Sequence, residues 1–236
     1  HNYVAHRGLH DDKNPENSLG AFKNAVEKGY TIEFDLHPLA DGTPVVFHDD
    51  TLKRMTNEDG YIKNIKDVKA LKKLKLNGGD ETIPTLEEAL NLIAGKTPII
   101  IEFKDFNSSP DTTFLKRVYE MLKTYNGDYA IMSFNPFILK WFKQNAPEVI
   151  RGQLASFFND LDMGRIKKFA LKRMLLNKHI SEPQFIAYKW DEVPNRFVKK
   201  FKNLPLLVWA VPSQQAYMKV VSHCDNIIFE NFEPRI

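Results

Sequence analysis

The sequence predicts an α/β fold, a TIM (β/α)8 barrel with a small insertion after the second strand. Short β-rich runs alternate with segments of helical pattern from one end of the chain to the other. Eight such runs in 236 residues leave about 30 residues for each, which is the size of one βα repeat. Several runs are almost continuously apolar, as is typical of strands buried on both faces. A doubly wound open sheet is the alternative, but it would carry a glycine-rich loop after its first strand, where this sequence has none.

The eight predicted strands follow one another at regular intervals, over residues 3–7, 30–37, 98–104, 128–133, 149–154, 184–189, 206–211 and 226–230. Helices with clear start signals are predicted between them, over residues 19–28, 86–94 and 137–145. Each follows a typical N-cap residue, namely Ser18, Thr85 and Asn135. Gly29 stands where a helix C-terminal glycine is expected.

One interval interrupts this alternation. Between His48 and Pro84 the sequence is polar and rich in turn residues around a lysine-rich helical stretch, and we interpret residues 50–83 as an excursion from the barrel. A turn signal at Asp41-Gly42 precedes it, followed by a predicted short return strand over 45–47. The remainder shows no linker, so we expect residues 1–236 to form a single domain.

The composition narrows the class of protein. With 33 Lys and Arg against 30 Asp and Glu, the net charge is +3, which falls short of the basic footprint of a nucleic-acid binder. The 43% of hydrophobic residues suffice for a sizeable core, yet no apolar run approaches the roughly 20 residues of a membrane-spanning helix. The single cysteine, Cys224, excludes an intrachain disulfide and a thiolate metal cluster.

Acidic residues gather on the early predicted strands. Glu33 and Asp35 are two residues apart and therefore share a strand face, and Glu102 belongs to the next long strand. Three converging carboxylates would repel one another and would be costly to bury unless a cation neutralised them. We therefore predict a divalent metal site, and its oxygen ligands favour Mg²⁺ or Ca²⁺. Salt bridges to Arg7 and Lys104 are the alternative.

Two histidines accompany these carboxylates, His6 at the end of the first strand and His48 at the end of the return strand. They could make the centre a transition-metal site, but imidazoles at strand ends also suit a general acid and base. Arg7 and Lys104 would add positive charge beside the metal. Such an arrangement favours stabilisation of a phosphoryl group in a transition state.

In their order along the chain, six motifs resemble the signature of the glycerophosphodiester phosphodiesterases. They are His6-Arg7-Gly8, Pro15-Glu16-Asn17-Ser18, Glu33-Phe34-Asp35, Asp41-Gly42 with Val45-Val46-Phe47-His48-Asp49, Ile83-Pro84-Thr85-Leu86-Glu87-Glu88, and Ile101-Glu102-Phe103-Lys104. Ser133-Phe134-Asn135 and Trp209 are similar to later family landmarks, so the resemblance covers essentially the whole chain and is thinner after residue 135. It implies a TIM barrel with a small insertion.

The resemblance also implies roles for single residues. Glu33, Asp35 and Glu102 would bind the divalent cation, Mg²⁺ or Ca²⁺. His6 and His48 would be the catalytic acid and base, one accepting a proton from an attacking glycerol hydroxyl and the other protonating the leaving alkoxide. Arg7, Lys104, Glu16 and Trp209 would form the substrate-binding set. Arg7 and Lys104 would contact the phosphate, and Glu16 would orient Arg7 or a histidine. Trp209 would be either an apolar wall of the pocket or barrel core.

The family resemblance implies hydrolysis of glycerophosphodiesters to glycerol 3-phosphate and an alcohol. The alternatives are a phospholipase D-like activity on lysophospholipids, and a non-catalytic binding module that retains the fold. The partner expected is a small phosphodiester and no nucleic acid. We interpret the basic segment 165–178 as a solvated face, with attraction of anionic lipid as the alternative. We expect a cytoplasmic protein, with secretion or an anchor as the alternative, because the chain begins with His1 rather than Met.

Overall fold

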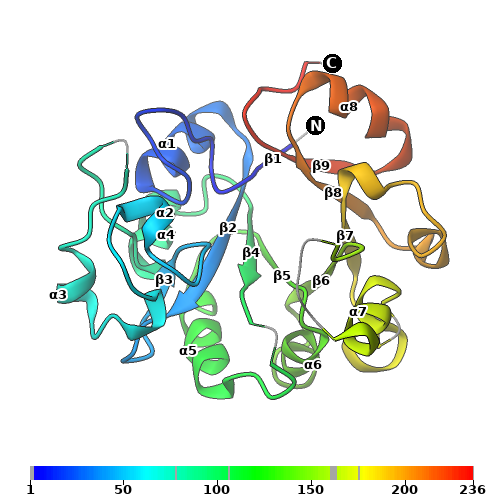
Figure 1. Ribbon diagram of the computed structural model, residues 1–236, viewed down its shortest axis with the longest axis horizontal. Helices are drawn as coiled ribbons and strands as arrows, with labels where there is room; N and C mark the ends of the chain where they lie inside the picture. The colour runs from blue at the N-terminus through cyan, green and yellow to red at the C-terminus, as the bar shows by residue number, and fades with distance from the viewer. Residues whose placement is uncertain (1–2, 78, 106, 160–163, 175, 236) are drawn as a thin grey trace. The chain divides into compact units, whose positions relative to one another are not determined.

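The structure is a computed structural model that describes residues 3–77, 79–105, 107–159, 164–174 and 176–235. The chain forms two compact units, residues 1–104 with 111–129, and residues 105–110 with 130–236. Each unit is built from βα repeats (Figure 1). Among the described residues, no helix combines the length and apolar composition that crossing a bilayer requires.

The first unit is built on three parallel strands, β1 (Val4–Ala5), β2 (Thr31–Pro38) and β4 (Ile99–Phe103). The short strand β3 (Pro44–Val46) pairs antiparallel with the end of β2 and confirms the predicted return strand. In the register between β2 and β4, Asp35 lies opposite Glu102. This register sets which side chains of the two strands share a face.

Three longer α-helices of the first unit lie outside the insertion. They are α1 (Leu19–Lys28), α4 (Leu86–Ile93) and α5 (Thr112–Leu122). Ser18 caps α1 and Gly29 ends it in the left-handed conformation, as predicted, and Thr85 and Glu88 form a reciprocal capping box on α4. The rings of Phe22 on α1 and Phe34 on β2 pack 5.4 Å apart, which buries this face of the strand.

The insertion has more apolar packing than its polar sequence suggests. It contains α2 (Lys53–Thr56), the 3-10 helix η1 (Ile62–Asn64) and α3 (Val68–Leu71), so the expected lysine-rich helix is only one short turn. Apolar side chains of the insertion nevertheless form a buried cluster with the segment around β3, made by Leu39, Val45, Phe47, Leu52, Met55, Ile62, Leu71, Leu76 and Ile83. This cluster fixes α2 in place, and with it the residues that α2 carries.

The second unit continues with five parallel strands, each paired with the next. They are β5 (Tyr129–Ser133), β6 (Ile150–Ala155), β7 (Phe185–Lys189), β8 (Leu206–Val211) and β9 (Asn226–Phe229). The α-helices between them are α6 (Pro136–Asn145), α7 (Arg165–Lys172) and α8 (Gln214–Val220). With β1, β2 and β4, all eight predicted parallel strands are present.

The second unit differs from a regular repeat in two connections. The π-helix η2 (Asn177–Ser181) follows α7, and only the 3-10 helices η3 (Trp190–Glu192) and η4 (Val198–Phe201) lie between β7 and β8. A further 3-10 helix, η5 (Val221–His223), extends α8. Pro194 stands near the start of the segment between β7 and β8, and Pro205 comes immediately before β8.

Gly152 on β6 allows a close approach within the second sheet. It pairs with Phe185 on β7, and a Cβ atom at position 152 would lie 2.0 Å from the Phe185 ring. Because that ring is buried, it cannot move aside freely. We expect Gly152→Ala to lower the free energy of unfolding by about 1–3 kcal/mol, as overpacking of a core does. Urea denaturation followed by circular dichroism measures this change.

The matched control is Gly79→Ala, the same substitution at an exposed position where the new Cβ would be 3.4 Å from its nearest neighbour. It should change the free energy of unfolding by less than about 0.5 kcal/mol. Equal stability of the two variants would show that Gly152 is not constrained by Phe185.

Candidate active site

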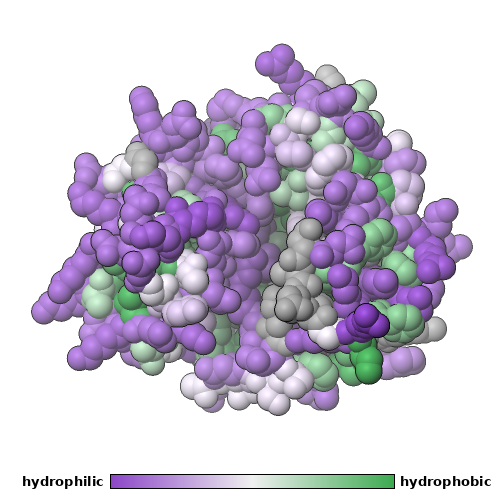
Figure 2. Space-filling view, in the orientation of Figure 1, coloured by the Kyte–Doolittle hydropathy of each residue, from purple (hydrophilic) through white to green (hydrophobic). Residues whose placement is uncertain are grey.

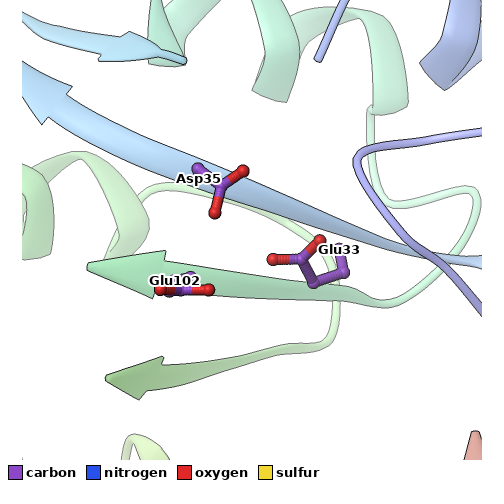
Figure 3. Close-up of side chains that lie close together, drawn as sticks. All are labelled: Glu33, Asp35 and Glu102. Carbon is purple, nitrogen blue, oxygen red and sulfur yellow. The ribbon is translucent and has the colours of Figure 1, made fainter. Parts of the chain in front are cut away.

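The centre of the candidate site is a group of three buried carboxylates. Strand alternation puts Ile32, Phe34 and Leu36 on the helix-covered face of β2 and turns Glu33 and Asp35 to the other face. Figure 3 shows these two side chains beside that of Glu102, which comes from the neighbouring strand β4. One oxygen from each carboxylate lies within 4.8 Å of the other two.

Burial makes this group unfavourable when all its members are ionised. Burial, reinforced by the charges of Asp35 and Glu102, raises the pKa of Glu33 well above its ordinary value. Burial also raises the pKa of Glu102 to about 7, against the opposing charge of Lys104. Such shifts mark a site that is short of positive charge.

The chemistry of these residues fits a divalent cation. Glu33 Oε1 is buried and has no hydrogen-bond partner among the described residues, so it has an oxygen to offer. Oxygens that share Mg²⁺ or Ca²⁺ at roughly 2.0–2.6 Å lie at most about 5 Å apart, and the three carboxylates meet this limit. A cation there would neutralise the excess negative charge.

Two basic side chains compensate part of that charge. Lys104 Nζ lies 3.0 Å from Asp35 Oδ1 and 2.6 Å from Glu102 Oε1, and Arg7 Nε lies 3.3 Å from Asp35 Oδ2. Burial opposes the ionisation of Asp35, but Lys104, His48 and Arg7 together outweigh it and keep the Asp35 pKa below its usual value. The predicted salt bridges therefore exist, but within the described part of the chain they reach Asp35 and Glu102 and not Glu33.

A tight turn after β1 brings His6 and Arg7 to the carboxylates. Arg7 adopts a positive φ of 55°, and its backbone N–H donates to Glu33 Oε2 at 3.0 Å. Gly8 follows with a φ of 81°, where a Cβ atom would lie 2.9 Å from the backbone of Ala21. Only glycine fits there without strain. The turn leaves His6 Nε2 3.9 Å from Glu33 Oε2.

His48 follows β3 and is held by a carboxylate of its own. Its Nδ1 lies 2.5 Å from Asp49 Oδ1, so Nδ1–H donates to Asp49 when the ring is neutral, which leaves Nε2 as the acceptor. Burial lowers the His48 pKa, although Asp49 opposes this effect. His37 Nε2 lies 2.9 Å from the backbone oxygen of His48 and fixes the main chain at this position.

Arg54 is a member of the site that the sequence did not reveal. Located on α2 in the insertion, it contacts Asp49 with Nε at 2.6 Å and Nη2 at 2.9 Å. It also contacts Glu16 with Nη1 and Nη2, both at 2.7 Å. Glu16 in turn accepts from Arg7 Nη1 at 2.6 Å. Arg54 therefore connects the carboxylate that holds His48 with the carboxylate that holds Arg7.

Asn17 was also missed as a site residue, although it lies within the Pro15–Ser18 motif. Its Nδ2 donates to Asp35 Oδ2 at 2.9 Å, and its side chain is buried. Its backbone N–H donates to the Arg7 backbone oxygen at 2.9 Å and closes the loop on itself. The signal available from the sequence was the asparagine itself, a residue that tolerates the left-handed conformation, and Asn17 adopts it with a φ of 59°.

The first unit thus assembles most of the predicted set, namely Glu33, Asp35, Glu102, Arg7, Lys104, His6, His48 and Glu16. Glu16 forms an ion pair with Arg7, and its role in orienting Arg7 or a histidine stays a prediction. Trp209 lies on β8 in the second unit, where its ring packs edge-on against Phe134 at 5.5 Å. Its contact with a substrate stays a prediction.

Fold and site together define a TIM-barrel protein with a candidate divalent-metal centre. Residues 6–232 match the model of the glycerophosphoryl diester phosphodiesterase family. The chain belongs to this family, as the six motifs indicated.

The relatives that the chain resembles in sequence support this family assignment. A glycerophosphodiester phosphodiesterase of Caldanaerobacter subterraneus is 37% identical over 64% of this chain and 65% of its own length. Human glycerophosphodiester phosphodiesterase 1 is 32% identical over 62% of this chain and 46% of its own length. A human lysophospholipase D is 31% identical over 61% and 49%, respectively. The matched segment thus spans less than two thirds of these relatives.

Solved structures confirm the predicted TIM barrel. A phosphodiesterase of Oleispira antarctica in complex with the product sn-glycerol-3-phosphate superposes with a TM-score of 0.78, at 26% identity, over 96% of this chain and 91% of that one. The glycerophosphodiester phosphodiesterase of Thermotoga maritima shares the fold, with a TM-score of 0.73 at 24% identity over 97% and 94%.

The Arg54 contacts lead to a prediction about the ionisation of Glu16. Although burial opposes it, hydrogen bonds and charges from Arg54 and Arg7 lower the Glu16 pKa from 4.5 to about 2. Ionised Glu16 therefore stabilises the fold above about pH 4.5, and this contribution is lost as the pH falls toward 2. We expect Arg54→Met to raise the Glu16 pKa, measured by NMR titration of its carboxyl carbon. The free energy of unfolding of this variant should then change less between pH 2 and pH 4.5 than that of the unmodified protein.

The matched control is Lys53→Met, which removes the neighbouring basic side chain, 63% exposed and paired with Asp59. This variant should leave the Glu16 pKa unchanged. A Glu16 pKa that is the same in Arg54→Met as in the unmodified protein would contradict the network.

Proposed function

We propose that the protein hydrolyses glycerophosphodiesters to sn-glycerol 3-phosphate and an alcohol with the help of a divalent cation. The observation that carries the proposal is the buried group of Glu33, Asp35 and Glu102, short of positive charge and flanked by two histidines and two basic side chains. Membership of the phosphodiesterase family and the product bound in the Oleispira structure support the substrate class.

Glu33, Asp35 and Glu102 would hold the cation. When bound, it would act as a Lewis acid that stabilises negative charge on the phosphoryl oxygens. The carboxylates suit Mg²⁺ and Ca²⁺ equally well by chemistry, since both prefer oxygen ligands. Arg7 and Lys104 would bind the same phosphoryl group from the side of Asp35, and Arg7 would do so with its guanidinium held in position by Glu16.

The two histidines would divide the proton transfers. Asp49 holds Nδ1–H of His48, so His48 Nε2 has the lone pair of a general base and would take the proton of the attacking glycerol hydroxyl. That hydroxyl would form a new bond to phosphorus, and the bond to the alcohol would break. His6 would protonate the leaving alkoxide. Water must then open the resulting cyclic phosphate, with the roles of the two histidines reversed.

Arg54 and Asp49 would act as positioning residues. Neither is assigned a contact with the substrate, but Arg54 connects Asp49, which orients His48, with Glu16, which orients Arg7. Charge-assisted hydrogen bonds of this kind hold reacting groups close to a productive geometry. The insertion would therefore contribute to catalysis through Arg54.

A second candidate is a phospholipase D-like activity on lysophospholipids. The observation that favours it is the 31% identity with a human lysophospholipase D. The chemistry at phosphorus would require the same kinds of groups. A non-catalytic role is less favoured, because the first unit brings the candidate metal, histidine and phosphate-binding residues together.

The first experiment measures release of glycerol 3-phosphate from glycerophosphocholine and glycerophosphoethanolamine, with Mg²⁺, with Ca²⁺ and with chelator. We expect metal-dependent release that chelator abolishes. Glu33→Gln should weaken the binding of Mg²⁺ or Ca²⁺ measured by calorimetry. Metal binding that is unchanged in this variant would contradict the ligand assignment.

Release of choline from lysophosphatidylcholine, without release from the two glycerophosphodiesters, would favour the second candidate. If folded, metal-loaded protein acts on none of these substrates, the proposed reaction is wrong and the protein is better described as a binding module.

The histidine assignment predicts a separate result. We expect His6→Ala and His48→Ala each to lower kcat by about 10²- to 10⁴-fold, the usual contribution of a positioned proton-transfer group. Far-ultraviolet circular dichroism and metal affinity should be retained. His223→Ala, a substitution of an exposed histidine on η5, is the control and should leave kcat unchanged. A kcat within threefold of the unmodified protein in either test variant would exclude that histidine from proton transfer.

A further inference from the structure

Helix α7 (Arg165–Lys172) of the second unit packs unusually little of its surface. None of its eight side chains, all of which the structure describes, is buried. Ile166 is 87% exposed and Phe169 is 44% exposed, although both are large and apolar. A helix on the surface of a globular domain normally buries an apolar stripe against the core. Here two apolar residues are presented to solvent instead.

Basic residues surround these apolar ones. Residues 165–173 include five Lys and Arg, and the sequence from Gly164 to Ser181 has no acidic residue. Arg165, Lys168 and Lys172 recur at helical spacing and form one stripe, and Ile166 and Phe169 lie on the adjacent stripe. Figure 2 shows strongly hydrophilic and hydrophobic residues side by side over α7. The helix is therefore amphipathic, with a basic stripe beside an exposed apolar edge.

The residues that follow α7 attach it to the second unit. Met174, just after the helix, is only 2% exposed and inserts into the core. The guanidinium of Arg173 stacks on the Phe169 ring, 3.7 Å from its centroid, and lies 5.6 Å from the Phe197 ring centroid. Arg173 thus forms cation–π contacts with both Phe169 and Phe197. The apolar edge is thus held in place rather than left to fold back onto the core.

An open, largely apolar hollow of about 960 Å³ adjoins α7. The residues that line it include Ile166, Ala170 and Leu171 from α7, Pro136 and Phe137 from the start of α6, and Phe134 just before that helix. The apolar surface therefore continues from the exposed edge of the helix into a cavity of the same unit. Such continuity is typical of surfaces that bind a partner.

We propose that α7 docks the protein onto an anionic lipid surface. Ile166 and Phe169 would dip into the boundary between head groups and acyl chains, and the hollow would receive apolar lipid. Arg165, Lys168 and Lys172 would pair with lipid phosphates and carboxylates, which their long, flexible side chains can reach. A lipid surface matches a uniformly basic stripe beside an apolar edge by charge, and it needs no shape-specific partner. This surface binding goes beyond the proposed hydrolysis and does not depend on it.

The test is co-sedimentation of the full chain with vesicles of phosphatidylcholine, alone or with about 30% phosphatidylserine. We expect binding to the mixed vesicles, much weaker binding to phosphatidylcholine alone, and weaker binding as salt is raised. The variant Ile166→Ser with Phe169→Ser should bind at least about tenfold more weakly, because the inserted apolar area is lost. Lys168→Glu with Lys172→Glu should lose at least about tenfold as well.

The matched control is on α8 of the same unit, where Met218 is 64% exposed beside the exposed Lys219. Met218→Ser with Lys219→Glu removes the same kinds of side chain and should leave vesicle binding within twofold. Circular dichroism checks that all variants fold, and hydrolysis of glycerophosphocholine can be followed in the same samples as an independent readout.

Two results would overturn the inference. One is failure of the unmodified protein to bind either vesicle, as would be found if α7 engaged another protein or only solvent. The other is equal vesicle binding by both α7 variants and the α8 control. Loss of binding in the α7 variants alone would support it, whether or not the protein hydrolyses any diester.

Discussion

The site depends on one electrostatic constraint, the burial of three carboxylates on one face of β2 and β4. Glu33, Asp35 and Glu102 cannot all be ionised there without nearby positive charge. Lys104 and Arg7 satisfy Asp35, and Lys104 also pairs with Glu102. What remains is the charge of Glu33, which a divalent cation would neutralise. The same imbalance that makes the site costly in its free form is what would give it affinity for metal.

A second network of charged side chains connects the site to the insertion. Arg54 joins Asp49 and Glu16, and through them His48 and Arg7. The packing that holds Arg54 is apolar, because Leu52 and Met55 on either side of it belong to the buried cluster of the insertion. Burial of these apolar side chains thus holds Arg54 where it can contact Asp49 and Glu16. This arrangement explains why a short excursion from a barrel would bear on the chemistry of residues that it does not contain.

Much of this could be predicted from the sequence, because strand periodicity is a local property. The period of two along β2 placed Glu33 and Asp35 on one face, and the cap residues of α1 and α4 gave their first residues correctly. Arg54 could not be predicted, since its partners come from two other segments and only tertiary packing brings them together. The connection between β7 and β8 was also not predicted as it is, because 3-10 helices lack the long periodic pattern of an α-helix.

The pairing of Asp35 with Glu102 has a consequence for folding itself. If β2 slipped by one residue against β4, its side chains would exchange faces. Phe34 would leave the aromatic layer that it shares with Phe22, and carboxylates would be pressed into that layer without partners. Burial of these acidic residues therefore disfavours a shifted register between β2 and β4. In this chain a one-residue shift of β2 against β4 would also take apart the candidate metal centre.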